Sequence, residues 1–175
     1  MSAQPFDKRD GFIWMDGKLI PWTDAKVHVL THAMHYGSAV FEGERAYGGK
    51  IFQSRKHSER LIESARILDM AVPYTAVEID AAKKATLKAN KQTDAYVRPI
   101  AWRGSEMMGV SAQHNTIHVA VATWEWPSYF DPAQRMKGIR LGMAEYRRPD
   151  PRTAPSRAKA AGLYMIGTMS KHAAM

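Results

Sequence analysis

Hydrophobic and polar positions alternate along the first fifty residues in the pattern of short strands joined by tight turns. The apolar runs Phe12–Met15 and Lys18–Trp22 flank Asp16 and Gly17, a dipeptide typical of a two-residue β-hairpin turn. Polar and apolar side chains also alternate over Lys26–Leu30, which predicts a half-buried third strand. The N-terminal part of the chain is therefore expected to be antiparallel β-structure.

A second hairpin is predicted after these strands. The segment Ala39–Tyr47 has the composition of a strand, and Gly48 and Gly49 supply a turn after it. Ile51 and Phe52 then begin the returning strand.

The hydrophobic period changes to that of helices in the middle of the chain. Ser54 is a candidate N-cap for a helix whose segment closes at Pro73. Apolar side chains recur in it at helical spacing: Leu61, Ala65 and Leu68. Thr75 and Glu78 match a capping box, which predicts a second helix ending at about Asn90.

Strands are predicted again at Ala95–Trp102 and Thr116–Trp124. Strands followed by helices and then by more strands are typical of an α+β domain, which we place at residues 1–125.

The composition changes to proline and scattered polar residues over residues 126–137, which we interpret as an interdomain linker. A strand over Gly138–Tyr146 and a helix running from about Ala158 to Met175 are expected after it. One strand and one helix cannot bury a core, so residues 138–175 are expected to be the start of a second, larger domain that is only begun.

Composition narrows the function classes. The 175 residues include 25 basic and 17 acidic side chains, a formal charge of +8, and no cysteine. The lack of cysteine excludes a disulfide scaffold and thiolate metal sites, and makes a reduced, cytoplasmic setting the default. The positive charge suits nucleic acid, a lipid surface or a small phosphate or carboxylate ligand, but the basic residues are not interleaved with stacking aromatics. An alternative is that a balancing acidic part of the chain is missing.

Three histidines raise the question of a metal site. His28, His32 and His35 stand at i, i+4 and i+7, which would gather them on one helix face. However, His28 lies inside an alternating β pattern, and no carboxylate joins the three at ligand spacing. We therefore favour structural or hydrogen-bonding histidines, and we expect no metal.

Lys159 stands out among the lysines because it lies among small residues, between a proline-rich loop and an apolar helix. Such a lysine can be desolvated, which lowers the pKa of its amine and readies it to form a Schiff base. On composition alone the argument is weak, because most lysines near a helix start are simply solvated.

Motifs along essentially the whole chain resemble the branched-chain amino acid aminotransferases of the fold-type IV family of pyridoxal-phosphate enzymes. Val40–Tyr47 resembles the family's Phe-Glu-Gly-x-Arg segment, Lys56–Leu61 its His-x-x-Arg-Leu helix start, and Ala95–Pro99 its Tyr-x-Arg-Pro strand. Lys159–Tyr164 resembles its catalytic-lysine segment. Several ordered motifs at consistent spacing are more specific than any one of them.

The resemblance implies a role for each matching residue. Lys159 is similar to the lysine that holds pyridoxal 5′-phosphate covalently and then moves the substrate α-proton. Arg60 resembles the arginine that binds the cofactor phosphate, although without the motif it would be read as a solvated helix arginine. Tyr164 resembles the tyrosine whose hydroxyl bonds the cofactor's phenolic oxygen.

Further residues resemble those that enclose the substrate in this family. Arg98 matches an arginine placed near the substrate carboxylate and any distal acidic group. The apolar pocket is matched by aromatic side chains: Tyr36, Phe41, Tyr96, Trp126 and Tyr129. A branched aliphatic side chain needs such an enclosure because its recognition rests on buried area. The alternative is that these are ordinary core residues. For Phe41 the sequence favours neither interpretation over the other.

The resemblance implies transamination of leucine, isoleucine or valine with 2-oxoglutarate, in a cytoplasmic homodimer without nucleic-acid or membrane partners. Another fold-type IV activity, a D-amino acid transaminase or an aminodeoxychorismate lyase, is the alternative. The chain stops 16 residues after Lys159 (175 minus 159), before the family's acidic partner of the pyridine nitrogen. We therefore expect the front portion of a longer transaminase, and a non-catalytic fragment or basic binding module remains a further alternative.

Overall fold

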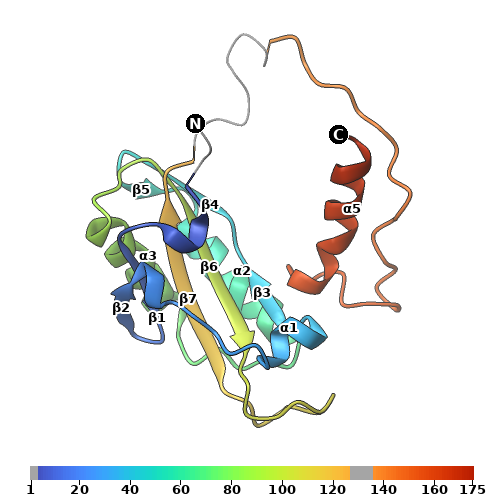
Figure 1. Ribbon diagram of the computed structural model, residues 1–175, viewed down its shortest axis with the longest axis horizontal. Coiled ribbons are helices and arrows are strands. Elements are labelled where there is room, and N and C mark those ends of the chain that lie inside the picture. The colour runs from blue at the N-terminus through green and yellow to red at the C-terminus, as the bar shows by residue number, and fades with distance from the viewer. Residues whose placement is uncertain (1–3, 127–135) are drawn as a thin grey trace.

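A seven-stranded antiparallel sheet forms the centre of the protein, whose computed structural model describes residues 4–126 and 136–175 (Figure 1). The strand order is β2-β1-β7-β6-β4-β5, and β3 also pairs with β6. The strands are β1 (Phe12–Met15), β2 (Lys18–Pro21), β3 (Ala39–Phe41), β4 (Glu44–Tyr47), β5 (Lys50–Ile51), β6 (Ala95–Arg103) and β7 (Ile117–Trp124).

Helices and short 3₁₀ turns complete the described chain. The α-helices are α1 (His32–Tyr36), α2 (Ser54–Ile67), α3 (Ala76–Ala89) and α5 (Met165–Ala173), and the 3₁₀ turns are η1 (Phe6–Lys8), η2 (Trp22–Asp24) and η3 (Ala161–Leu163). None of the helices that the structure describes is both long and apolar enough to cross a lipid bilayer.

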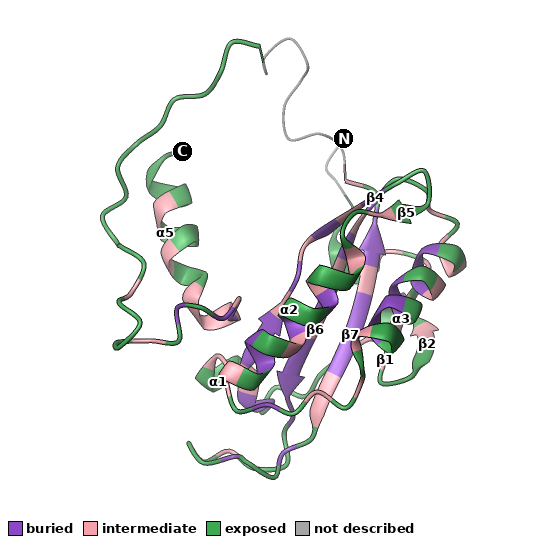
Figure 2. Ribbon diagram, turned by 180° about the vertical axis from the view of Figure 1, so that it is seen from behind, coloured by how far each residue is buried: buried purple, intermediate pink, exposed green. Residues whose placement is uncertain are grey.

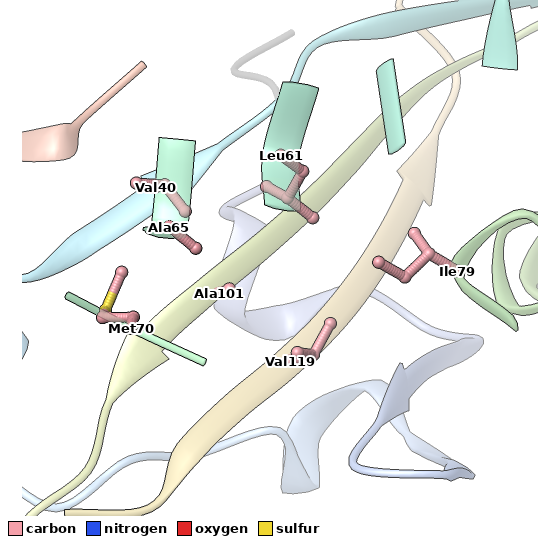
Figure 3. Close-up of a cluster of buried hydrophobic side chains, with 7 residues drawn as sticks. All are labelled: Val40, Leu61, Ala65, Met70, Ile79, Ala101 and Val119. Carbon is pink, nitrogen blue, oxygen red and sulfur yellow. The ribbon is translucent and has the colours of Figure 1, made fainter. Parts of the chain in front are cut away.

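Helices α2 and α3 cover one face of the sheet, as Figure 2 shows. Buried side chains of both helices and of the connection between them meet buried side chains of β3, β6 and β7 there: Val40, Leu61, Ala65, Met70, Ile79, Ala101 and Val119 (Figure 3). Because side chains alternate across a strand, the opposite face of the sheet carries the other set of residues from β6. Val97 and Ala101 are fully buried toward the helices, whereas Tyr96, Arg98 and Ile100 are half-buried.

The pairing of β3 with β6 extends the two faces of the sheet, one covered by helices and one not, to β3. Val40 pairs with Ala101 on the helix-covered face, and Phe41 pairs with Ile100 on the other face. Consequently the aromatic ring of Phe41 belongs to the same face as Arg98.

Local turn and capping signals predicted several elements correctly. Asp16 and Gly17 join β1 to β2, and Gly48 and Gly49, both with positive φ (54° and 78°), join β4 to β5. The capping box at Thr75 and Glu78 is present with both of its hydrogen bonds. The predicted hairpins and second helix are therefore confirmed, as are the two long strands β6 and β7.

The expected strand at Lys26–Leu30 is wrong. The segment carries no strand, and its apolar side chains are exposed. Its backbone is used locally instead, because the Thr31 N–H donates to the carbonyl of His28 and the Leu30 N–H donates to the His28 ring. Alternation without a neighbouring strand edge does not make a strand.

The expected strand at Gly138–Tyr146 is wrong for the same reason. Ile139, Leu141 and Met143 are exposed, and no strand in the described part of the chain pairs with this segment. Most of the predicted linker, residues 127–135 of 126–137, lies outside the described residues.

Two predicted helix starts also needed correction. The N-cap of α2 is Gln53, with φ of 52°, and Ser54 instead donates its hydroxyl to Asp80 at 3.0 Å. The C-terminal helix begins at Met165 rather than near Ala158, because Ala160 is held in extended form by its bridge to Val40 and the 3₁₀ turn η3 follows it.

Candidate active site

Lys159 is fixed at the edge of the sheet by its own backbone. The Phe41 N–H donates to the Lys159 carbonyl at 3.2 Å, and the Lys159 N–H donates to the hydroxyl of Ser64, on α2, at 3.0 Å. The next residue, Ala160, forms an isolated β-bridge with Val40. The lysine is therefore anchored to β3 on one side and to α2 on the other.

The Lys159 amine is held between two aromatic rings. Its Nζ donates a hydrogen bond to the Tyr164 hydroxyl, and lies 4.9 Å from the centre of the Tyr164 ring and 5.0 Å from that of Phe41. The two rings are themselves 4.7 Å apart. Ring faces stabilise an ammonium group electrostatically, so the amine has a defined position rather than free solvation.

A cavity of about 330 Å³ opens beside this amine. Its lining carries several cations, Arg60, Arg148, Arg157 and Lys159, with the hydroxyl of Tyr164 among them. No carboxylate is among the described lining residues. A site of this charge suits a compact anion such as a phosphate.

Arg60 is oriented by a buried carboxylate. Its Nε and one terminal nitrogen donate to the two oxygens of Glu42, each at 2.6 Å, while His57 Nδ1 lies 2.8 Å from the same carboxylate. Burial raises the pKa of the Glu42 carboxyl, but the hydrogen bonds from Arg60 and His57 outweigh burial and hold that pKa below its ordinary value. The hydrogen bond to Glu42 in turn raises the pKa of the Arg60 guanidinium.

Aromatic and cationic side chains extend the site across the open face of the sheet. The guanidinium of Arg98 lies 4.5 Å from the centre of the Phe41 ring and donates to the Tyr96 hydroxyl at 2.9 Å. The Tyr96 ring lies 5.0 Å from that of Trp126, whose carbonyl accepts a hydrogen bond from Arg45 at 2.9 Å. Phe41 thus connects the lysine to a surface of aromatic rings around one arginine.

The chain also matches a known protein family. Residues 39–175, which carry all of the contacts just described, match the protein family described as amino-transferase class IV. The chain belongs to the class IV aminotransferases.

This class IV aminotransferase chain is similar to curated branched-chain enzymes. It is 42% identical over 161 residues to the branched-chain-amino-acid aminotransferase of Pseudomonas aeruginosa, covering 90% of this chain and 52% of that one. It is 37% identical over 164 residues to the enzyme of the same name in Escherichia coli strain K12, covering 90% and 53%. The chain therefore spans about half the length of the curated relatives that it matches.

Solved structures show the same relation. The T.th. branched-chain amino acid aminotransferase, solved with pyridoxamine 5′-phosphate, matches with a TM-score of 0.88 and 37% identity over 94% of this chain and 55% of that one. The branched-chain aminotransferase of Thermoproteus uzoniensis, solved with norvaline, matches with a TM-score of 0.85 and 34% identity over 92% and 55%. The predicted α+β fold of the fold-type IV class is confirmed.

Two predicted site residues are not placed with the side chains around Lys159, Phe41 and Arg98. Tyr36 stacks on His32 with ring centres 4.5 Å apart, and its hydroxyl donates to the Met108 carbonyl at 3.1 Å. Its contacts therefore lie at α1 and not at the Phe41 ring. Tyr129 lies outside the described residues.

The three spaced histidines make hydrogen bonds instead of gathering. His32 is buried, with its ring nitrogens 2.7 Å from the Ser38 hydroxyl and 3.1 Å from the Gly109 carbonyl. His35 bonds the Val29 carbonyl at 2.9 Å. The interpretation as hydrogen-bonding histidines is confirmed.

Sequence reasoning missed a second ionic cluster under the sheet. Lys83 of α3 is fully buried and lies 2.7 Å from Glu44 Oε1, 3.5 Å from Asp80 Oδ1 and 2.7 Å from the Ser58 hydroxyl. Burial raises the pKa of Glu44 to about 7 and outweighs the opposing effect of Lys83, while the nearby Glu42 and Asp80 add smaller contributions to the rise. One feature of the sequence could have revealed this cluster: Lys83 falls one turn after Ile79, on the apolar face of its helix.

Sequence reasoning also missed Glu42 as a partner of Arg60. The only sign was its place in the motif between Phe41 and Gly43.

The donor set of this site fits pyridoxal phosphate. An aldehyde needs an amine at one end of its cavity, a phenolic oxygen needs a hydroxyl beside it, and a phosphate needs guanidinium donors. Lys159, Tyr164 and Arg60 all line the same cavity and supply these three groups.

Proposed function

We propose that the chain is part of a branched-chain amino acid aminotransferase and supplies the pyridoxal-phosphate lysine of its active site. The observation that carries the proposal is the position of the Lys159 amine, hydrogen-bonded to Tyr164 in the cavity that Arg60 also lines. The similarity to named branched-chain enzymes supports the choice of leucine, isoleucine and valine as donors and 2-oxoglutarate as acceptor.

Each side chain has a task that follows from its position. Arg60 would bind the cofactor phosphate, and the Tyr164 hydroxyl would hold its phenolic oxygen. The Lys159 amine would carry the cofactor and would move the proton from the substrate α-carbon. The cofactor supplies the electron sink for that proton removal.

The substrate occupies the face of the sheet beyond Phe41 in this proposal. Arg98 receives the substrate carboxylate, because its guanidinium lies over Phe41 and is steadied by the Tyr96 hydroxyl. Trp126, packed against Tyr96, adds an apolar wall for a branched side chain. We assign Tyr36 and Tyr129 to this enclosure from the family motifs alone, because the contacts of Tyr36 in this chain lie at His32 and Met108.

The assembly and the domain boundaries belong to the same proposal. We assign residues 1–125 to the small domain, 126–137 to the linker and 138–175 to the start of the large domain. Exposed apolar side chains on a protein surface often mark a site of association. The homodimer is supported by a group of such side chains before and in α1: Val27, Val29, Leu30 and Met34. We also assign the protein to the cytoplasm.

The test is amino transfer by the purified enzyme of which this chain is part, loaded with pyridoxal phosphate. We expect L-leucine and 2-oxoglutarate to give glutamate, and Lys159→Arg to lower the rate by at least about 100-fold, because a guanidinium neither carries the cofactor nor moves the proton. The matched control is Lys171→Arg, at an exposed lysine of α5, which leaves the rate unchanged.

Amino transfer from D-alanine without transfer from L-leucine would contradict the choice of substrate and favour a D-amino acid transaminase. Pyruvate release from aminodeoxychorismate would favour the lyase. Equal rates for Lys159→Arg and the unaltered chain would contradict the assignment of the lysine.

A further inference from the structure

Arg60 reaches the cavity from α2 with a side chain that is 55% exposed, yet its guanidinium is fixed by a carboxylate that is fully buried. We propose that Glu42 is a positioning residue, which with His57 sets the plane of the Arg60 guanidinium for the incoming phosphate. This inference rests on the proposed function, because it assumes that Arg60 binds the cofactor phosphate.

The contact is bidentate and leaves donors free for the cavity. Arg60 uses its Nε and one terminal nitrogen on the two oxygens of Glu42, each at 2.6 Å. A guanidinium has five N–H groups in a fixed plane, so three of them remain for another anion. Because two bonds to one carboxylate fix that plane, the direction of the remaining donors is fixed as well.

Glu42 is itself held from several sides. Its backbone N–H donates to the Pro99 carbonyl at 2.9 Å, which ties it to β6. His57, one helical turn before Arg60, contacts the carboxylate at 2.8 Å. A buried carboxylate that loses its partners is costly, so the charge on Glu42 keeps Arg60 in place.

A second arginine of α2, Arg66, forms an ordinary surface ion pair that serves as a comparison. Arg66 makes the same two-fold contact with Glu63, at 2.7 Å for each bond, but both side chains are largely exposed and Arg66 does not line the cavity. An exposed pair of this kind contributes little. The buried carboxylate and the cavity distinguish Glu42 and Arg60, and Glu63 is therefore a matched control.

The experiment follows the Arg60 Nε–H signal by NMR while inorganic phosphate is added to the full chain. We expect saturable binding by the unaltered chain, binding weaker by about tenfold in Glu42→Gln, and binding within about twofold of the unaltered chain in Glu63→Gln. Unchanged or tighter phosphate binding in Glu42→Gln would overturn the proposal, as would the absence of any phosphate effect on Arg60 in the unaltered chain.

A second measurement separates positioning from general support of the fold. Affinities for pyridoxal phosphate and for pyridoxal, which lacks the phosphate, are compared in the same variants. We expect Glu42→Gln to weaken only the phosphorylated compound, and an equal loss for both would overturn the proposal. If Glu42→Gln does not fold, Glu42→Asp keeps the charge one methylene short and is expected to give a smaller loss with the same selectivity; no selectivity would again overturn it.

The same measurements keep the two proposals apart. Phosphate bound at Arg60 in a Glu42-dependent way, without amino transfer, would sustain this inference and contradict the proposed function. Amino transfer together with phosphate binding that does not depend on Glu42 would support the proposed function and contradict this inference.

Discussion

Gly43 sits where no side chain fits. A Cβ at this position would lie 2.2 Å from the Tyr96 hydroxyl oxygen, well inside any contact distance. The residue stands between the two buried carboxylates Glu42 and Glu44, so the main chain here approaches the ring that steadies Arg98. The glycine of the Phe-Glu-Gly segment is therefore required by sterics.

Gly43→Ala is expected to displace the Tyr96 ring and lower the free energy of unfolding by about 1–3 kcal/mol, measured by urea denaturation. Tyr96→Phe in the same background removes the closest atom, and should recover part of the loss. Gly142→Ala, at a position with no atom within 4 Å, is the control and should have no effect. Equal stability of Gly43→Ala and the control would contradict this account.

The element scale shows which parts of the fold were readable from the sequence. Hairpin turns and the capping box at Thr75 depend on residues three or four positions apart, so local chemistry determines them. The strands expected at Lys26–Leu30 and Gly138–Tyr146 failed because alternation gives a pattern without giving a partner strand. Pairing is a tertiary event that a single segment does not encode.

The candidate site divides along the same line. Lys159 was found from its small neighbours and from motif resemblance, and its contact with Tyr164 spans only five residues. Glu42 was missed because its hydrogen bond to Arg60 joins the end of a strand to a helix, 18 residues apart. The local sequence around either residue does not indicate that the other is its partner.

The capping box of α3 permits a test at the same scale. Thr75→Ala removes the side chain that accepts the Glu78 N–H, and is expected to lower the free energy of unfolding by about 1 kcal/mol. Thr93→Ala, whose hydroxyl lies in an exposed turn, is the control. Urea denaturation of both variants checks the prediction, which fails if the two lose the same amount.

At the scale of the whole molecule, the buried cluster around Lys83 ties α3 to the sheet through Glu44. The folded pKa of Glu44, about 7, lies above the ordinary value of 4.5. Between these values the folded state holds a proton that the unfolded state has released. The stabilising contribution is therefore full below about pH 4.5 and is lost as the pH rises through about 7.

We expect the free energy of unfolding of the unaltered chain to decline between about pH 5 and about pH 8, by up to the order of 3 kcal/mol from Glu44 alone. Glu44→Gln keeps the shape without the titration and should flatten this part of the profile. Urea denaturation across the range measures both. A profile that is equally steep in the variant would show that another group controls it.

The most direct test of the central claim is chemical trapping of the cofactor on the protein. The purified chain is incubated with pyridoxal phosphate, reduced with borohydride, digested and mapped by mass spectrometry. The account predicts one phosphopyridoxyl group per chain, on Lys159, and none in Lys159→Arg. No adduct, or an adduct spread over exposed lysines such as Lys137 and Lys171, would contradict it.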